Sequence, residues 1–284
     1  MQRLSLIGFG EAARTFARAA RWEGPVRVFD IKTSEAATRY AKLIEYRALR
    51  LRGCETSSEA VRRARVILSL VTADQASVVG LEAASAIEEG ALYLDMNSVA
   101  PGTKRMTAAK IDGAGGRYVD VAIMAPVSPQ ALGVPLLLAG PHAPAGGDAL
   151  AAAGFTNIDV AGARIGDASA VKMIRSVIVK GIEALTAEAM IAAERAGVTK
   201  TVLASLGGEW PAQADYNLER MLVHGLRRAA EMEEVAITLD DLGVEPLMTR
   251  GTITRQRALG GLGIPSPAGL AVKLAEIEGA RGTA

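Results

Sequence analysis

The chain opens with a glycine pattern that can hold a phosphate group. Residues 8–13, Gly-Phe-Gly-Glu-Ala-Ala, follow a short apolar run and fit the spacing G-x-G-x-x-A. Between a strand and a helix, the first glycine permits a tight turn and the second lets the backbone approach a pyrophosphate. The free N–H groups of the helix N-terminus then favour the anion. We therefore predict that Gly8, Phe9, Gly10, Glu11 and Ala12 bind a dinucleotide; a purely structural turn is the alternative.

An acidic residue follows at the distance expected for contact with a ribose. Asp30 ends the second apolar run, twenty residues after Gly10, where a carboxylate can accept hydrogen bonds from the adenosine ribose. The same charge would repel a 2′-phosphate, so the pattern favours NAD over NADP, although Lys32 could offset part of the repulsion. Val71 and Thr72, at the end of a later strand, are expected to complete the cofactor site.

These residues need a sheet to position them, and the first 165 residues alternate apolar runs with helical stretches. Such alternation predicts βαβ units and a mostly parallel sheet covered on both faces. Capping-box spacing at residues 56–59 and again at 72–75 indicates two further helix starts. We predict strands at residues 3–7, 26–29, 66–70, 92–95 and 118–122, with 136–139 and 158–161 extending the sheet, and helices at 11–22, 34–49 and 101–111.

The pattern changes near residue 165. Residues 167–196 contain no proline and one internal glycine, with one apolar side marked by Val171, Ile174, Ile178, Ile182 and Leu185. The residues after this stretch have helical spacing without strand alternation. The predicted fold is an α/β N-terminal Rossmann domain, doubly wound, over residues 1–165, followed by an all-α C-terminal domain over residues 166–284 that begins with a long interdomain helix.

Composition excludes several classes of protein. Half of the 284 residues are apolar, 22% are charged and the formal net charge is +1, which is typical of a globular protein without a nucleic-acid surface. The single cysteine, Cys54, cannot form an internal disulfide, and no apolar run approaches the ~20 residues of a membrane span. We expect a cytoplasmic location, no signal peptide and no metal. His142 and His224 have no partner at metal or triad spacing, and the charged run 227–234 is interpreted as a solvated helix face.

Further motifs occur in a recognisable order. Residues 95–101, Asp-Met-Asn-Ser-Val-Ala-Pro, are similar to a D-x-S-T-x-x-P segment. Residues 120–124, Asp-Val-Ala-Ile-Met, take the place of a D-A-P-V-S-G-G segment in this series. Residues 166–172 fit G-x-x-x-x-x-K. With the glycine loop, this series resembles the β-hydroxyacid dehydrogenase family, which includes 3-hydroxyisobutyrate and 6-phosphogluconate dehydrogenases. The C-terminal part resembles a divergent bacterial subgroup.

The resemblance implies that Lys172 is the catalytic acid/base. Alcohol oxidation by hydride transfer requires removal of the hydroxyl proton, which a lysine can accept if burial or a nearby cation such as Arg175 lowers its pKa. We also predict substrate contacts from Asn97, Ser98, Ile123, Met124, Arg175 and Ser176, although Asn97 and Ser98 could equally cap the following helix. An isolated lysine on a helix is usually solvated, so the prediction depends on the set of motifs.

This chain departs from the family pattern at two places. Ser176 replaces the family's asparagine, and Met124-Ala125-Pro126 replaces its serine-glycine-glycine. A more apolar wall favours a substrate larger or more apolar than 3-hydroxyisobutyrate, unless Met124 is a core residue. The alternatives are a lyase that releases formaldehyde through a Lys172-assisted retro-aldol step, and a non-catalytic nucleotide-binding module. The expected partners are a small-molecule substrate and a second copy of the chain in a homodimer.

Overall fold

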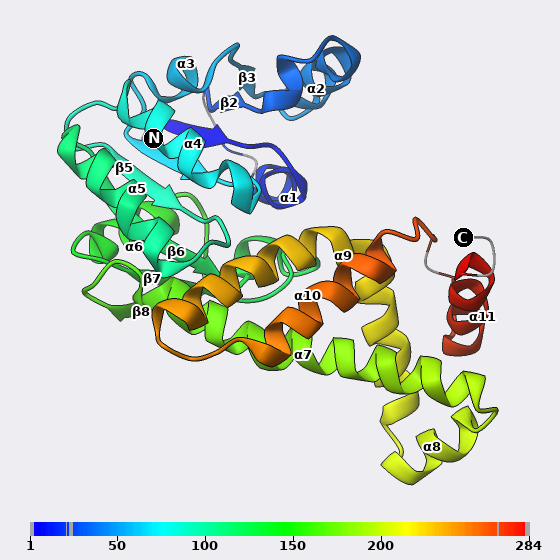
Figure 1. Cartoon of the computed structure of the whole chain (residues 1–284). Helices are drawn as coiled ribbons and strands as arrows, with labels where there is room; N and C mark the ends of the chain where they lie inside the picture. Colours follow the sequence, from blue (N-terminus) through cyan, green and yellow to red (C-terminus); the bar gives the residue numbers. More distant parts are fainter. Residues whose placement is uncertain (1–2, 21, 23–24, 266, 282–284) are drawn as a thin grey trace. The chain divides into compact units, whose positions relative to one another are not determined.

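The computed structural model describes residues 3–20, 22, 25–265 and 267–281 (Figure 1). It divides into two compact units, Met1–Lys172 and Met173–Ala284. The division falls inside one long helix, seven residues after the boundary expected at 165. Lys172 therefore belongs to the same unit as the glycine loop.

The first unit contains an eight-stranded sheet with the order β3-β2-β1-β4-β5-β6-β7-β8. All neighbouring strands are parallel except β6 and β7. The predicted doubly wound, mostly parallel fold is confirmed, and the strand order reverses between β1 and β4, the position at which such sheets bind nucleotides. The strands are β1 (Leu4–Ile7), β2 (Arg27–Phe29), β3 (Arg52–Gly53), β4 (Val66–Ser69), β5 (Leu92–Asp95), β6 (Arg117–Ile123), β7 (Leu136–Ala139) and β8 (Ile158–Gly162).

Helices connect these strands, and buried apolar side chains lie on both sides of the sheet. Leu6 and Leu68 belong to one apolar cluster, whereas Ile7 and Ile67 belong to another, because successive side chains of a strand point to opposite faces. The helices are α1 (Glu11–Ala20), α2 (Ala36–Ala48), α3 (Ser57–Val61), α4 (Ala73–Ala84), α5 (Pro101–Gly113) and α6 (Ala143–Ala152), with short 3-10 turns η1 (Ile31–Thr33) and η2 (Ala131–Gly133).

The two predicted capping boxes have different outcomes. Thr56 caps α3 by accepting a hydrogen bond from the Glu59 amide at 3.0 Å, as predicted. Helix α4 also begins where expected, but Thr72 makes no side-chain capping bond. The box predicted at residues 72–75 is therefore wrong: the Gln75 side chain donates to the Asp74 carboxylate instead.

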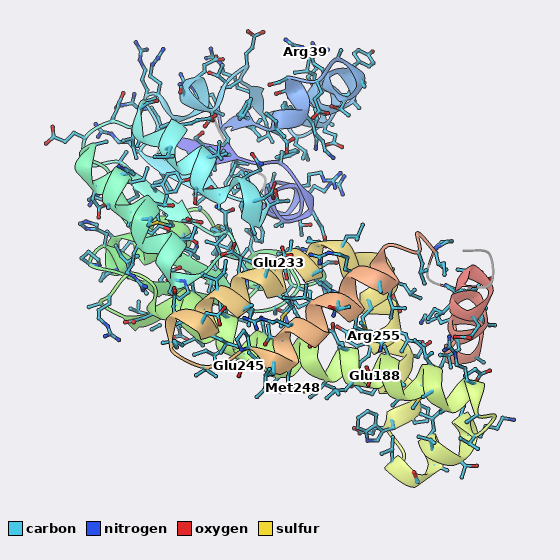
Figure 2. All side chains as sticks on the ribbon, in the orientation of Figure 1. Arg39, Glu188, Glu233, Glu245, Met248 and Arg255 are labelled. Atoms are coloured by element: carbon cyan, nitrogen blue, oxygen red, sulfur yellow. The ribbon has the colours of Figure 1, made fainter. Side chains whose placement is uncertain are left out.

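The second unit is helical. It comprises the larger part of α7 (Asp167–Arg195), then α8 (Thr199–Leu206), α9 (Trp210–Asp241), α10 (Leu247–Gly260) and α11 (Leu270–Arg281). Helices α9 and α10 cross closely, since a Cβ on Gly225 would lie 2.4 Å from the Gln256 carbonyl oxygen. Arg255 of α10 also pairs with Glu188 of α7 at 2.7 Å (Figure 2).

Burial in this unit corrects one expectation and qualifies another. Arg228, within the run expected to be solvated, is 8% exposed and pairs with the buried Glu183 of α7, so that interpretation is wrong at this position. The apolar side of α7 is exposed: Ile178, at its centre, is 66% accessible. The opposite side of the helix, including Glu183 and Ala187, is the one that packs in the unit.

Among the described residues, no helix combines the length and the apolar character that crossing a bilayer requires.

Candidate cofactor and catalytic site

The glycine loop joins β1 to α1, and its two glycines meet different constraints. Gly8 has φ +88°, and a Cβ there would lie 2.2 Å from the Leu70 carbonyl oxygen of the neighbouring β4 loop. Gly10 is exposed, and an added Cβ would meet nothing within 4 Å. The loop is thus closed against the protein at Gly8 and open at Gly10, as a backbone cradle for a pyrophosphate requires. Glu11 and Ala12 begin the helix that follows.

Polar side chains bind both the backbone amide and the backbone carbonyl of Phe9. The Asp30 carboxylate accepts a hydrogen bond from the Phe9 amide at 2.7 Å and another from the Lys32 amide at 3.0 Å. The Phe9 carbonyl accepts from Lys42 Nζ at 2.8 Å, and this lysine is 8% exposed. A carboxylate has about four acceptor positions, so Asp30 can still accept from a ribose while it fixes the loop. Lys42 was not predicted, because one lysine on an amphipathic helix has no distinguishing signal.

A second loop, at the end of β4, is held in the same way. The Asn97 side chain accepts from the Val71 amide at 2.6 Å and donates to Ser69 Oγ at 2.9 Å. Asn97 is 3% exposed. Thr72 is exposed at the start of α4. Val71 therefore lies against the glycine loop at Gly8, with Thr72 next to it, and Asn97 holds this second loop from the segment that follows β5.

Lys172 meets Ser98 within the first unit. Its Nζ donates to Ser98 Oγ at 2.6 Å, and both residues are half-buried. Ser98 follows the carboxyl end of β5, which is the end of a parallel sheet where ligands bind. Two residues predicted from separate motifs are thus brought together, and they form a pair that can exchange a proton with a bound hydroxyl or carbonyl.

The first turn of α7 is anchored on Asp120. Asp120 Oδ2 accepts from the Gly166 amide at 3.2 Å, the Ser169 amide at 3.0 Å and Ser169 Oγ at 3.1 Å. This carboxylate is fully buried in β6. A negative charge at a helix N-terminus is favourable, so Asp120 fixes the turn immediately before Lys172.

A fully buried lysine lies beside the same carboxylate. Lys104 of α5 donates to the Asp95 carbonyl at 2.6 Å and pairs with Asp95 Oδ1 at 3.1 Å and with Asp120 Oδ1 at 3.4 Å. Tyr118 donates to Asp95 Oδ2 at 2.7 Å. Burial, followed by the charge of Asp95, raises the pKa of Tyr118 well above its usual value, which keeps the hydroxyl available as a donor. Sequence patterns carried no signal that Lys104 would be buried.

The remaining predicted substrate residues lie in two places. Ile123 ends β6, and Met124 packs partly buried against Ala122, Ala139 and Ala168 of the first unit. Arg175 and Ser176 belong to the second unit, on the turn of α7 that follows Lys172. Arg175 is exposed and Ser176 is buried.

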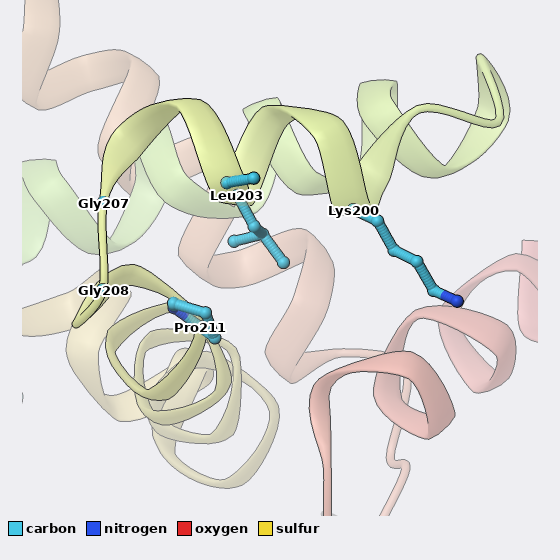
Figure 3. Close-up of a pocket in the computed structure, with 6 residues that line it drawn as sticks. Lys200, Leu203, Gly207, Gly208 and Pro211 are labelled. Atoms are coloured by element: carbon cyan, nitrogen blue, oxygen red, sulfur yellow. The ribbon is translucent and has the colours of Figure 1, made fainter.

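A surface hollow in the second unit has a different character (Figure 3). Its lining is mainly apolar, and Lys200 is the one titratable group among the residues that form it. It therefore lacks the paired acid/base groups found around Lys172. The lining consists of Lys200, Leu203, Ala204, Gly207, Gly208 and Pro211.

Comparison with known proteins agrees with this geometry. Residues 3–158, more than half of the chain, match the model of the NAD binding domain of 6-phosphogluconate dehydrogenase, and residues 193–259 match a domain of unknown function, DUF1932. A conserved hypothetical protein from Sinorhizobium meliloti is 34% identical, with 99% of this chain and 96% of that chain covered and a TM-score of 0.73.

Two further solved structures share the fold. A conserved protein described as structurally similar to 3-hydroxyacid dehydrogenases is 30% identical over 91% of this chain and 97% of its own, with a TM-score of 0.69. The 3-hydroxyisobutyrate dehydrogenase of Mycobacterium tuberculosis, solved with L-serine, is 15% identical, with 99% of each chain covered and a TM-score of 0.71.

Proposed function

Because the chain belongs to the β-hydroxyacid dehydrogenase family, we propose that it is a nicotinamide-dependent oxidoreductase in which Lys172 is the general acid/base. The scaffold is that of NAD(P)-binding 3-hydroxyacid dehydrogenases and reductases. The observation that supports the role of Lys172 is the 2.6 Å contact between Lys172 Nζ and Ser98 Oγ. It puts a protonatable nitrogen and a hydroxyl at the carboxyl end of the sheet.

The residues present fit a dinucleotide. Gly10 leaves the backbone open for a pyrophosphate, and the α1 N-terminus favours its charge. Asp30 keeps acceptor positions for the ribose hydroxyls and opposes a 2′-phosphate, which supports NAD rather than NADP. When bound, the nicotinamide supplies a hydride acceptor or donor.

The protein's own part in the reaction is to move a proton. In oxidation, neutral Lys172 accepts the proton of the substrate hydroxyl as the carbon loses its hydride and the carbonyl forms. In reduction, the Lys172 ammonium returns that proton to the carbonyl oxygen. Ser98 orients Lys172 and offers a hydroxyl to the same oxygen.

The substrate is proposed to be larger or more apolar than 3-hydroxyisobutyrate. Met124, Ala125 and Pro126 stand where the family resemblance places serine-glycine-glycine, and Met124 rests on small alanine side chains. Methionine on such a surface can adapt to an irregular apolar group. Faster turnover of 3-hydroxyisobutyrate than of hydroxyacids with longer or aromatic side chains would contradict this substrate class.

The test combines cofactor binding with turnover. NADH and NADPH are titrated by fluorescence against wild type, Lys172→Ala and the exposed-lysine control Lys110→Ala. Each protein is then assayed on 3-hydroxyisobutyrate, L-serine, longer-chain and aromatic 3-hydroxyacids, and the matching aldehydes. We expect NADH to bind all three proteins and turnover to be lost only in Lys172→Ala. Turnover retained in Lys172→Ala would refute the assignment, and formaldehyde release without nicotinamide reduction would indicate the retro-aldol reaction.

A further inference from the structure

A buried ionic cluster connects the two chain segments that meet at Lys172 and Ser98. Asp95, the last residue of β5, and Asp120, in the middle of β6, are register partners, and Lys104 of α5 contacts both. All three side chains are fully buried. Neighbouring strands lie about 4.8 Å apart, so without the lysine two carboxylates would face each other in a medium that does not screen them.

Each carboxylate of the cluster positions one member of the Lys172–Ser98 pair. Asp95 Oδ1 accepts from the Asn97 amide at 3.0 Å and so fixes the turn that leads to Ser98. Asp120 holds the Gly166 and Ser169 amides at the start of α7. Ser169 lies three residues before Lys172, on the same side of the helix.

The contacts close into a ring. It runs from Lys172 to Ser98, through the turn to Asp95, across Lys104 to Asp120, and through Ser169 back to Lys172. Among the ion pairs of the described residues, Lys104 is the one cation that contacts both carboxylates of this ring. Its loss leaves the two aspartates with unbalanced charge, and both can respond by moving apart or by taking up a proton.

We propose that Lys104 is a positioning residue: it holds Asp95 and Asp120 in register, and thereby sets the distance between Ser98 and Lys172. This inference rests on the proposed function, because the pair it positions is the acid/base pair. Lys104 is fully buried and contacts the Asp95 carbonyl as well as the two carboxylates, so it acts on Ser98 and Lys172 through Asp95 and Asp120.

The first test needs no substrate. Amide hydrogen exchange is measured on wild type, Lys104→Met and the control Lys110→Met, which alters an exposed lysine of the same helix. We expect the amides of Gly166 and Ser169 to exchange at least about tenfold faster in Lys104→Met, with the β1 amides unchanged, since local opening need not follow global unfolding. Unchanged exchange at residues 166–169, or equal acceleration throughout the sheet, would overturn the proposal.

The second test asks whether Lys104 acts through Lys172. Turnover of the best substrate from the panel is measured for Lys104→Met, Lys172→Ala and the double variant. We expect Lys104→Met to lower kcat about tenfold or more with NADH affinity retained, and to lower it no further when Lys172 is already alanine. Multiplicative losses in the double variant would show an independent role and refute the positioning.

Failure of the proposal can be distinguished from failure of the proposed function. Undiminished turnover in Lys172→Ala refutes the proposed function and this inference with it, whereas an inactive Lys172→Ala beside a fully active Lys104→Met refutes the inference alone. If Lys104→Met does not fold, Ser169→Ala removes the hydroxyl contacts to Asp120 and the Gly166 carbonyl, Asp120→Asn removes the charge that pairs with Lys104, and the same two measurements apply to both variants.

Discussion

The two glycines of the cofactor loop should respond in opposite ways to the addition of one methyl group. At Gly8 the new Cβ would lie 2.2 Å from the Leu70 carbonyl oxygen and 2.8 Å from Val71 Cγ1, at φ +88°. At Gly10 it would meet nothing within 4 Å. Gly8→Ala should therefore damage the fold, whereas Gly10→Ala should leave the fold intact and obstruct the ligand.

The magnitudes can be worked from these contacts. A left-handed alanine costs roughly 1–2 kcal/mol and overpacking against backbone roughly 1–3 kcal/mol, so Gly8→Ala should lose about 2–5 kcal/mol. For a domain of this size that lowers Tm by roughly 5–15 °C. Gly10→Ala should keep Tm within about 2 °C, yet raise the Kd for NADH at least about tenfold, because its Cβ stands where the pyrophosphate approaches.

Thermal unfolding followed by circular dichroism, together with NADH fluorescence titration, checks both variants. Wild-type NADH affinity in a folded Gly10→Ala protein would refute the placement of the pyrophosphate. An unchanged Tm in Gly8→Ala would refute the close approach between the β1 and β4 loops.

Four further predictions concern other parts of the chain. Ser98→Ala removes a charge-assisted hydrogen bond worth about 1.5–3 kcal/mol, so kcat should fall about 10- to 150-fold and Ser98→Thr should restore it; equal activity of all three proteins would contradict this role. Arg228→Met leaves the buried carboxylate of Glu183 uncompensated, and urea unfolding should show a loss of about 3–5 kcal/mol; a loss below about 1 kcal/mol would contradict the burial argument. Burial lowers the pKa of Lys180, although the charge of Glu231 acts in the opposite direction. The unfolded chain therefore binds this proton more tightly than the folded protein does, so the free energy of unfolding of wild type, relative to Lys180→Met, should rise as the pH approaches 10.5. Parallel pH profiles of the two proteins would contradict this prediction. Ile178, 66% exposed on α7, is expected to be covered by the second copy in a homodimer. Ile178→Asp should therefore sediment as a monomer, whereas the control Ile44→Asp, at another exposed isoleucine, should not. An unchanged oligomer in Ile178→Asp would contradict the assignment of this face of α7 to the dimer interface.

Sequence patterns predicted the elements with strong periodicity and missed those without it. Strand β3 has two residues, Arg52 and Gly53, both exposed, and so has no apolar run to recognise. Helix α6 contains Pro144, Gly146 and Gly147, which are typical of a turn. It forms because a glycine lets the helix lie against the sheet: a Cβ on Gly146 would be 3.0 Å from Val119. Tertiary packing thus overrides local propensity at this helix.

The site was predictable wherever function demands a particular residue type at a particular spacing. The glycine loop and Lys172 satisfy that condition. Lys42, Lys104 and Arg228 do not, because a basic residue on a helix is solvated far more often than it is buried. Their burial depends on partners that are distant in the sequence, such as Asp120 for Lys104, and no local period encodes such a pairing.

Two side chains that sequence motifs assign to ligands also hold the loops on which the ligand would rest. Asp30, directly after β2, binds the Phe9 amide of the β1 loop, and Asn97, two residues after β5, binds the Val71 amide of the β4 loop. Strands β1 and β4 are neighbours in the sheet, with β2 and β5 on either side of them. Each outer strand therefore supplies one acceptor to one inner loop.

This arrangement explains why an acceptor is required at both positions whether or not it reaches the nucleotide. An alanine at either site would leave a loop amide without its partner, and the loop would lose its fixed conformation. A mutation at Asp30 or Asn97 that weakens cofactor binding is thus not by itself proof of direct contact. Asparagine at position 30 distinguishes the two roles, because its side-chain oxygen can still accept from Phe9 while the charge that opposes a 2′-phosphate is gone. Because its amide nitrogen cannot accept from the Lys32 amide, we expect Asp30→Asn to lower the Tm by only about 2–4 °C, the cost of one exposed hydrogen bond, and to narrow the preference for NADH over NADPH. An unchanged ratio of the two Kd values would show that Asp30 serves the loop alone.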